Sequence, residues 1–183
     1  YLEKKINKYL KTSIFLLPLE KISEEIKEDN WIKKVKLSTN YKNTLFVQLE
    51  EYKAIGIYNY NDNFFYFDEN GKIIDELNNI KNMSNEFIIF SGQSSNLEAK
   101  LILDMLDHIN FREKFKIKNI EFIKKRRWNI TLNNNIKLML SEYEPMQSIQ
   151  NFINIQKNLS KIEMNNIKYL DLRNINKTLI NYN

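Results

Sequence analysis

The only histidine of the chain, His108, is the first side chain to consider for metal chemistry. It follows Asp104 by four residues, a spacing that places both side chains on one face of a helix. Imidazole and carboxylate can both bind a divalent cation, but a specific site requires a third or fourth ligand. The alternative is a solvated polar helix face, and the sequence favours that interpretation.

Several carboxylates occur in close pairs, which raises the question of general acid–base chemistry. The pairs are Glu24 and Glu25, Glu28 and Asp29, Asp68 and Glu69, and Glu142 with Glu144. Such chemistry needs two carboxyl groups held in different environments across a cleft. These residues are neighbours in sequence, beside turns or on a helix face, so we expect them to be solvated.

Nucleophilic and nucleotide chemistry have little support in this composition. The chain has no cysteine, which excludes disulfides, a thiolate nucleophile and cysteine-ligated zinc. Its three glycines cannot form a dinucleotide fingerprint or a P-loop. A catalytic triad requires a partner residue that orients its histidine, and the sequence singles out no such partner for the one histidine present. The sequence therefore predicts no enzymatic activity, no metal and no cofactor.

The densest positive charge is the run Lys124-Lys125-Arg126-Arg127 followed by Trp128. Basic residues beside an aromatic ring could grip phosphates and stack on a base. Trp128, however, begins an alternating run with Ile130 and Leu132, so we expect its ring to point into the core. The net charge of +5 keeps a nucleic-acid-binding protein open as an alternative of another class.

The longest apolar run, residues 14–19, contains Pro18 and is far shorter than the ~20 residues that a membrane span needs. The first residue is not Met, so we expect the chain to be cut from a longer protein.

Residues 1–60 predict a small α+β unit. Leu2, Ile6 and Leu10 recur at helical spacing in a first helix that ends near residue 11. Pro18 suits the first turn of a second helix, which spans residues 18–26. Alternation over residues 35–37 and 45–49 predicts a hairpin.

Residues 61–183 predict a second domain, with the border in the polar stretch 59–63. Strands are expected at 64–67 and 72–74 around an Asn70-Gly71 turn, and at 87–90, 117–123, 128–132, 136–140, 167–172 and 178–182. Ser95 to Glu98 form a capping-box pattern that predicts a helix with an apolar stripe of Leu97, Leu101, Leu106 and Ile109. Pro145 predicts the start of a further helix, which carries Ile149, Phe152 and Ile153.

Several segments, in order along the chain, resemble the extracytoplasmic part of the FtsQ/DivIB family of bacterial cell-division proteins. They are residues 30–35 (NWIKKV), 44–51 (TLFVQLEE), 67–74 (FDENGKII), 126–134 (RRWNITLNN) and 169–173 (YLDLR). The doubled Arg before Trp128 and the helix after Gly92 are similar to the alphaproteobacterial branch. Residues 51–56 depart from the family's Glu-x-x-Pro-x-Ala pattern. The resemblance implies a POTRA-like domain, with its first strand missing, followed by a mixed β-sheet domain with flanking helices.

The resemblance also implies a function. The family consists of non-catalytic inner-membrane proteins, anchored by one upstream transmembrane helix, with this part on the periplasmic side. They bind the coiled-coil division proteins FtsB and FtsL and link them, with other divisome members, to septal peptidoglycan synthesis.

The expected binding site is the terminal strand, where a partner strand would add to the sheet edge. The site residues are Arg173, Asn174, Thr178, Leu179, Ile180 and Tyr182. Asn174 departs from the Tyr often found at its position in the family. Two alternatives remain: a strand that merely frays at its end, and a POTRA-type module of outer-membrane assembly or secretion.

We predict that neither a divalent ion nor a nucleotide binds specifically. Thermal unfolding measured with zinc, magnesium or ATP should give the same Tm as buffer with EDTA, and His108→Ala should behave like the parent chain. A saturable rise in Tm that His108→Ala abolishes would contradict this prediction.

Overall fold

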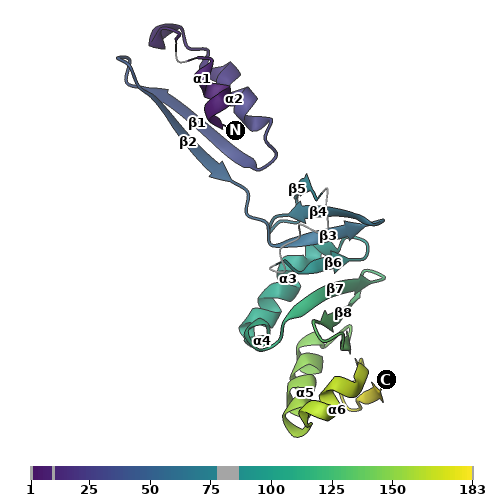
Figure 1. Ribbon diagram of the computed structural model, residues 1–183. Coiled ribbons are helices and arrows are strands. Elements are labelled where there is room, and N and C mark those ends of the chain that lie inside the picture. The colour runs from purple at the N-terminus through teal and green to yellow at the C-terminus, as the bar shows by residue number, and fades with distance from the viewer. Residues whose placement is uncertain (1, 10, 78–86, 183) are drawn as a thin grey trace. The chain divides into compact units, whose positions relative to one another are not determined.

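The chain divides between Lys53 and Ala54 in the computed structural model, which describes residues 2–9, 11–77 and 87–182 (Figure 1). This division lies upstream of the border that we expected at residues 59–63. The reason is β3 (Gly56–Tyr60), which pairs with strands of the second unit and therefore belongs to its sheet. Residues 61 and 62 form the turn of a hairpin inside that unit rather than a linker.

The first unit has the predicted order of two helices and an antiparallel hairpin, with α2 packed on the two-stranded sheet and α1 packed on α2. Its elements are α1 (Leu2–Asn7), the 3-10 helix η1 (Ile14–Leu16), α2 (Leu19–Lys27), β1 (Ile32–Thr39) and β2 (Leu45–Glu51). Pro18 is the residue before α2 rather than its first residue, and α1 ends at Asn7, earlier than expected. Leu10 lies outside the described residues.

The core of this unit forms where α2 meets the sheet. Ile22 and Ile26 are four residues apart, so they share one face of α2, and both are buried with Ile32. Alternate residues of β1 and β2 complete this core, because side chains of a strand point to opposite faces in turn. Burial of this stripe holds the short α2 on the sheet.

Among the described residues of the second unit, nine strands form one mixed sheet. Its strands are β3, β4 (Asn63–Phe67), β5 (Ile73–Glu76), β6 (Ile89–Ser91), β7 (Ile117–Ile123), β8 (Arg127–Leu132), β9 (Lys137–Leu140), β10 (Ile167–Leu172) and β11 (Leu179–Tyr182). Their order across the sheet is β11-β10-β9-β8-β7-β6-β3-β4-β5. The pairs β3–β6, β6–β7 and β9–β10 are parallel, and the other pairs are antiparallel.

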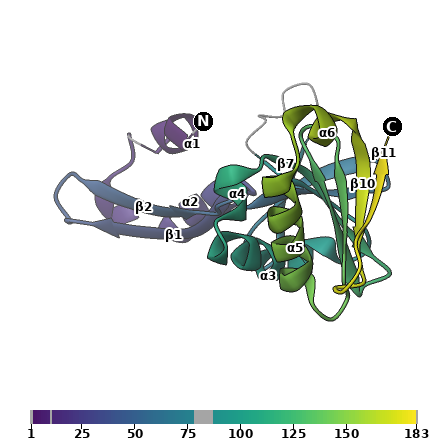
Figure 2. The same cartoon turned by 90° about the horizontal axis from the view of Figure 1, so that it is seen from below.

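Helices α3 (Ser95–His108) and α5 (Pro145–Asn158) pack on one face of this sheet (Figure 2). The short helix α4 (Phe111–Lys114) packs on α3, and α6 (Lys161–Asn166) follows α5 in the chain. The expected strand positions and the α+β class are confirmed, and so is the burial of Ile149, Phe152 and Ile153 on α5. The short helices α4 and α6 were not predicted. None of the helices in the described ranges is long and apolar enough to cross a membrane.

The prediction for α3 was wrong in two respects. Ser94 is the residue before the helix, with a left-handed backbone (φ 63°) and no capping hydrogen bond from its side chain, so no capping box forms at Ser95. Leu97 and Leu101 are exposed, and the buried face consists of Ala99, Ile102, Leu103 and Leu106. The backbone at Ser94 sets the direction in which the chain enters α3. The buried face of α3 therefore differs from the apolar stripe that Leu97 and Leu101 suggested.

That path depends on Gly92, which lies between β6 and α3. Its φ of +94° is a conformation that residues with a side chain rarely adopt, and a Cβ at this position would lie 2.2 Å from the carbonyl oxygen of Phe122 on β7. Only glycine lets the backbone approach β7 this closely before it turns into α3.

We therefore expect Gly92→Ala to lower the free energy of unfolding of the second unit by about 2 kcal/mol or more, because backbone strain and a clash with backbone add up. Urea denaturation followed by circular dichroism measures it. Exposed Glu98→Ala on α3 is the control and should change stability by less than about 0.5 kcal/mol. Equal stability of the two variants would show that Gly92 is not required.

Candidate protein-binding edge

The expected binding site lies at one end of the strand order, on β11. In β10 the apolar residues Ile167, Leu170 and Leu172 are buried, which fixes the strand against the helices. β11 pairs with β10 in antiparallel register, with Leu170 opposite Ile180 and Asp171 opposite Leu179. Ile180 is half-buried and packs against the core, so the edge strand is anchored by its own side chain.

The outer side of β11 is the free side of the sheet. No strand among the described residues pairs with it there. Leu179 and Tyr182 are large apolar side chains that are 53% and 51% exposed. An edge of this kind presents backbone N–H and C=O groups together with apolar side chains to an incoming strand.

Arg173, which follows β10, is held by Asp171. The Arg173 guanidinium forms two hydrogen bonds to the Asp171 carboxylate, one of them from Nε to Oδ1 at 2.8 Å. The backbone N–H of Arg173 also donates to Oδ1, at 3.1 Å. These bonds from Arg173 lower the pKa of Asp171 below its usual value, and the same contact raises the pKa of Arg173. Both groups are therefore charged at neutral pH.

Asn174 shapes the turn between the two strands. Its side-chain oxygen accepts a hydrogen bond from the backbone N–H of Asn176 at 3.0 Å, and its carbonyl accepts from Lys177 N–H at 3.2 Å. Asparagine commonly closes turns through such a bond to the backbone two residues on. Its observed contacts are therefore those of a turn former.

Two side chains of helix α5 hold this turn by donating hydrogen bonds to its backbone carbonyls. The buried Ser148 hydroxyl donates to the carbonyl of Leu172 at 2.9 Å and accepts from the backbone N–H of Ser141 at 2.9 Å. The Asn151 side chain donates to the carbonyl of Ile175 at 2.8 Å. Neither Ser148 nor Asn151 was predicted from the sequence. The available signal was a small polar residue, Ser148, beside the buried positions Ile149 and Phe152 of α5.

A hollow of about 350 Å³ opens beside the turn, lined by Asp171, Arg173, Asn174, Lys177 and Leu179. Its two cations outnumber its single carboxylate, which is already paired with Arg173. Of the expected site residues, the structure brings Arg173, Asn174 and Leu179 together here. Thr178 is half-buried next to Leu179, whereas Ile180 packs toward the core and Tyr182 lies at the far end of β11.

Two further candidate sites were Asp104 with His108, and the basic run before Trp128. Asp104 pairs with Lys100 at 3.1 Å, and the described residues contain no group of three or more His, Cys, Asp or Glu side chains suited to a metal. Trp128 is buried and stacks on Phe122 with ring centroids 4.1 Å apart, which confirms that its ring points into the core. Its ring is therefore not available to stack on a base.

Comparison with known proteins gives two family matches. Residues 56–173 match the C-terminal region of the cell division protein FtsQ/DivIB, and residues 1–52 match the FtsQ-type POTRA domain.

Individual relatives with similar sequences are also cell division proteins. The chain is 31% identical over 178 residues to a cell division protein FtsQ of Rickettsia prowazekii, covering 97% of this chain and 64% of that protein. It is 25% identical over 170 residues to a cell division protein FtsQ of Rhizobium meliloti, covering 92% and 53%. A cell division protein DivIB of Clostridium acetobutylicum is 32% identical over 72 residues, 39% of this chain and 29% of that protein. The chain thus spans less than two thirds of the length of these relatives.

We predict that Ser148→Ala loosens the edge, because it leaves a buried N–H and a buried C=O without their shared partner. The free energy of unfolding should fall by about 1–3 kcal/mol in urea denaturation. Exposed Lys157→Ala on the same helix is the control and should be nearly neutral. A neutral Ser148→Ala would mean that the hydroxyl does not support the turn.

Proposed function

Since this chain belongs to the FtsQ/DivIB family of cell-division proteins, we propose that it acts as a non-catalytic scaffold of the division machinery. In this proposal it binds FtsB- and FtsL-type proteins by adding a partner strand to the outer side of β11. The single observation that supports it most is the position of β11 as the outermost strand with two exposed apolar side chains.

Strand addition separates adhesion from specificity. Main-chain hydrogen bonds to the edge provide adhesion whatever the sequence of the partner, and pockets for alternate side chains provide specificity. In β11, Leu179 and Tyr182 lie near opposite ends of the strand, so they can contact different side chains of a short bound segment.

The hollow at the turn adds a charge preference. Arg173 and Lys177 line it, and the Asp171 carboxylate already neutralises one of these cations. The remaining positive charge suits an acidic side chain in the partner, close to the point where its strand meets Leu179. Complementary charge of this kind sets register and speeds association more than it raises affinity.

The proposal includes location and role. The chain would lie on the periplasmic side of the inner membrane, carried by a single upstream transmembrane helix, and would connect its partners to septal peptidoglycan synthesis. Family membership supports this arrangement.

We predict that proline in β11 weakens partner binding. Successive N–H groups of a strand point to opposite sides, so of Ile180→Pro and Asn181→Pro one removes a donor on the free side. At least one variant should raise the Kd for the periplasmic segment of an FtsB-type partner by tenfold or more, measured by isothermal titration calorimetry. Asn181→Ala is the matched control and should bind normally.

The edge mechanism would be wrong if both proline variants kept full affinity while circular dichroism showed them folded. Arg173→Glu provides a second measurement, since it should weaken binding and reduce its salt dependence without affecting the edge backbone.

A further inference from the structure

Two turns of the first unit meet at the end opposite the ends of β2 and α2. One is η1, and the other is the turn that joins β1 to β2 (Figure 1). The rings of Phe15 from the first turn and Tyr41 from the second stack with centroids 6.3 Å apart. We call Phe15, Leu16, Tyr41 and the flanking Lys11 and Lys42 the apolar tip.

The apolar tip exposes an unusual amount of large apolar surface. Phe15, Leu16 and Tyr41 are 73%, 75% and 71% exposed, and they are consecutive in sequence or stacked on one another. None of the three belongs to the core of the unit, which forms around Ile22, Ile26 and Ile32. Clustered apolar side chains outside a core indicate an interaction surface.

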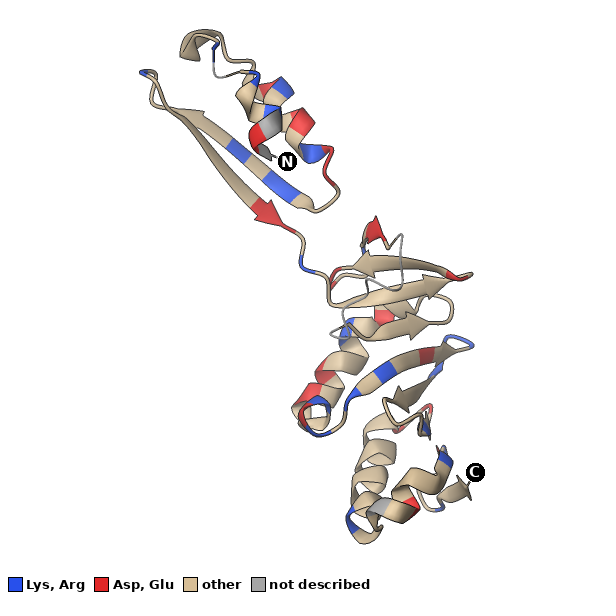
Figure 3. Cartoon of the chain, viewed as in Figure 1, with Lys and Arg blue, Asp and Glu red and all other residues tan. Residues whose placement is uncertain are grey.

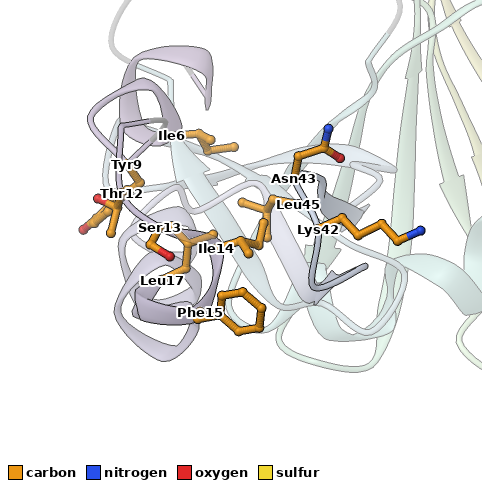
Figure 4. Close-up of a pocket in the computed structure, with 10 residues that line it drawn as sticks. All are labelled: Ile6, Tyr9, Thr12, Ser13, Ile14, Phe15, Leu17, Lys42, Asn43 and Leu45. Atoms are coloured by element: carbon orange, nitrogen blue, oxygen red, sulfur yellow. The ribbon is translucent and has the colours of Figure 1, made fainter.

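A hollow of about 370 Å³ lies behind Phe15 (Figure 4). Ile6, Ile14, Leu17 and Leu45 give it apolar walls, and Lys42 lies at its side. The tip can therefore accept apolar groups as well as present its own.

Lysines occur along the whole first unit, whereas most of its acidic side chains lie away from the tip (Figure 3). Lys42 follows Tyr41 directly and Lys11 precedes Phe15 by four residues; both are exposed, and neither forms an ion pair among the described residues. The nearest carboxylate along the chain is Glu20, in the first turn of α2. The other acidic residues with described side chains lie elsewhere in the unit: Glu3 on α1, and the rest in or after the second half of α2 and at the end of β2 (Figure 3).

We propose that the apolar tip inserts into the surface of an anionic lipid bilayer. Phe and Leu side chains that protrude from turns can enter the region between headgroups and acyl chains without a matching groove. Tyr is favoured at the headgroup level because one end of its ring is apolar and the other polar. Two unpaired lysines add attraction to anionic headgroups, about fivefold in partition for each. This site is separate from the β11 edge and does not depend on the proposed partner.

The experiment is sedimentation of the 183-residue chain with vesicles. The chain should bind vesicles that contain phosphatidylglycerol, bind phosphatidylcholine vesicles at least tenfold more weakly, and dissociate in high salt. Phe15→Ser with Leu16→Ser should lower the partition coefficient by about tenfold or more. Lys11→Gln with Lys42→Gln should lower it by about 25-fold on anionic vesicles, from the two lysine contributions together.

Controls come from equally exposed side chains of the second unit. Tyr143→Ser with Ile162→Ser removes comparable apolar surface, and Lys157→Gln removes one exposed lysine charge, to be compared with Lys42→Gln alone. These variants should bind vesicles like the parent chain. In a separate variant, Phe15→Trp should show a blue-shifted emission on binding and quenching by lipids brominated near the headgroup.

Absence of vesicle binding by the parent chain would overturn the proposal, as would tip variants that bind like the controls. A tip whose substitution leaves vesicle binding intact but disrupts capture of a protein partner would be a protein-docking surface, and the lipid assignment would be wrong. Circular dichroism is measured for every variant to check that it is folded. Because the tip lies outside the core, its substitutions should leave the spectrum unchanged.

Discussion

One row of apolar side chains holds the second unit together and decides what its edge presents. Pairing across six adjacent strands places these residues directly opposite one another: Phe90, Ile120, Ile130, Leu138, Leu170 and Ile180. The first five are fully buried under the helices, and Ile180 is half-buried at the end of the row. A slip of one residue in any strand would turn its apolar set to the other face. Packing of the row therefore fixes the register of β11, and with it the outward position of Leu179.

The sequence predicted this row well because it depends on local alternation. Trp128, Ile130 and Leu132 repeat every second residue, and burial on one face is sufficient to explain such a pattern. Helix α3 was harder, because two leucines with helical spacing lie on its exposed side. Which face of α3 is buried depends on the backbone of Gly92 and Ser94, where positive φ angles set the direction of entry. No hydrophobic pattern contains that information.

The candidate site also combines features that the sequence predicts with features that it does not. A terminal strand at a sheet edge could be expected from its place in the chain, and so could the turn-forming role of asparagines before it. The anchoring of that turn could not, because Ser148 and Asn151 contact residues 24 positions further along the chain. The hollow between Arg173, Lys177 and Leu179 likewise exists only because β10 and β11 pair in the observed register. Long-range contacts of this kind are decided by tertiary packing, which a single sequence does not reveal.

The two ends of the strand order differ in a way that bears on selectivity. The last strand at one end, β5, carries Asp75 and Glu76, whereas the turn leading into β11 carries Arg173 and Lys177. Main-chain pairing alone would not distinguish one edge from the other, since every edge offers the same backbone groups. Charge does distinguish them: under the proposed mode of binding, the cations of the hollow would favour an acidic partner strand at β11. β11 is only four residues long, so few backbone bonds are available to a partner and non-specific association through the edge stays weak. Under the proposed mode of binding, main-chain bonds would hold the partner strand, and contacts with Leu179, Tyr182 and the basic hollow would select it.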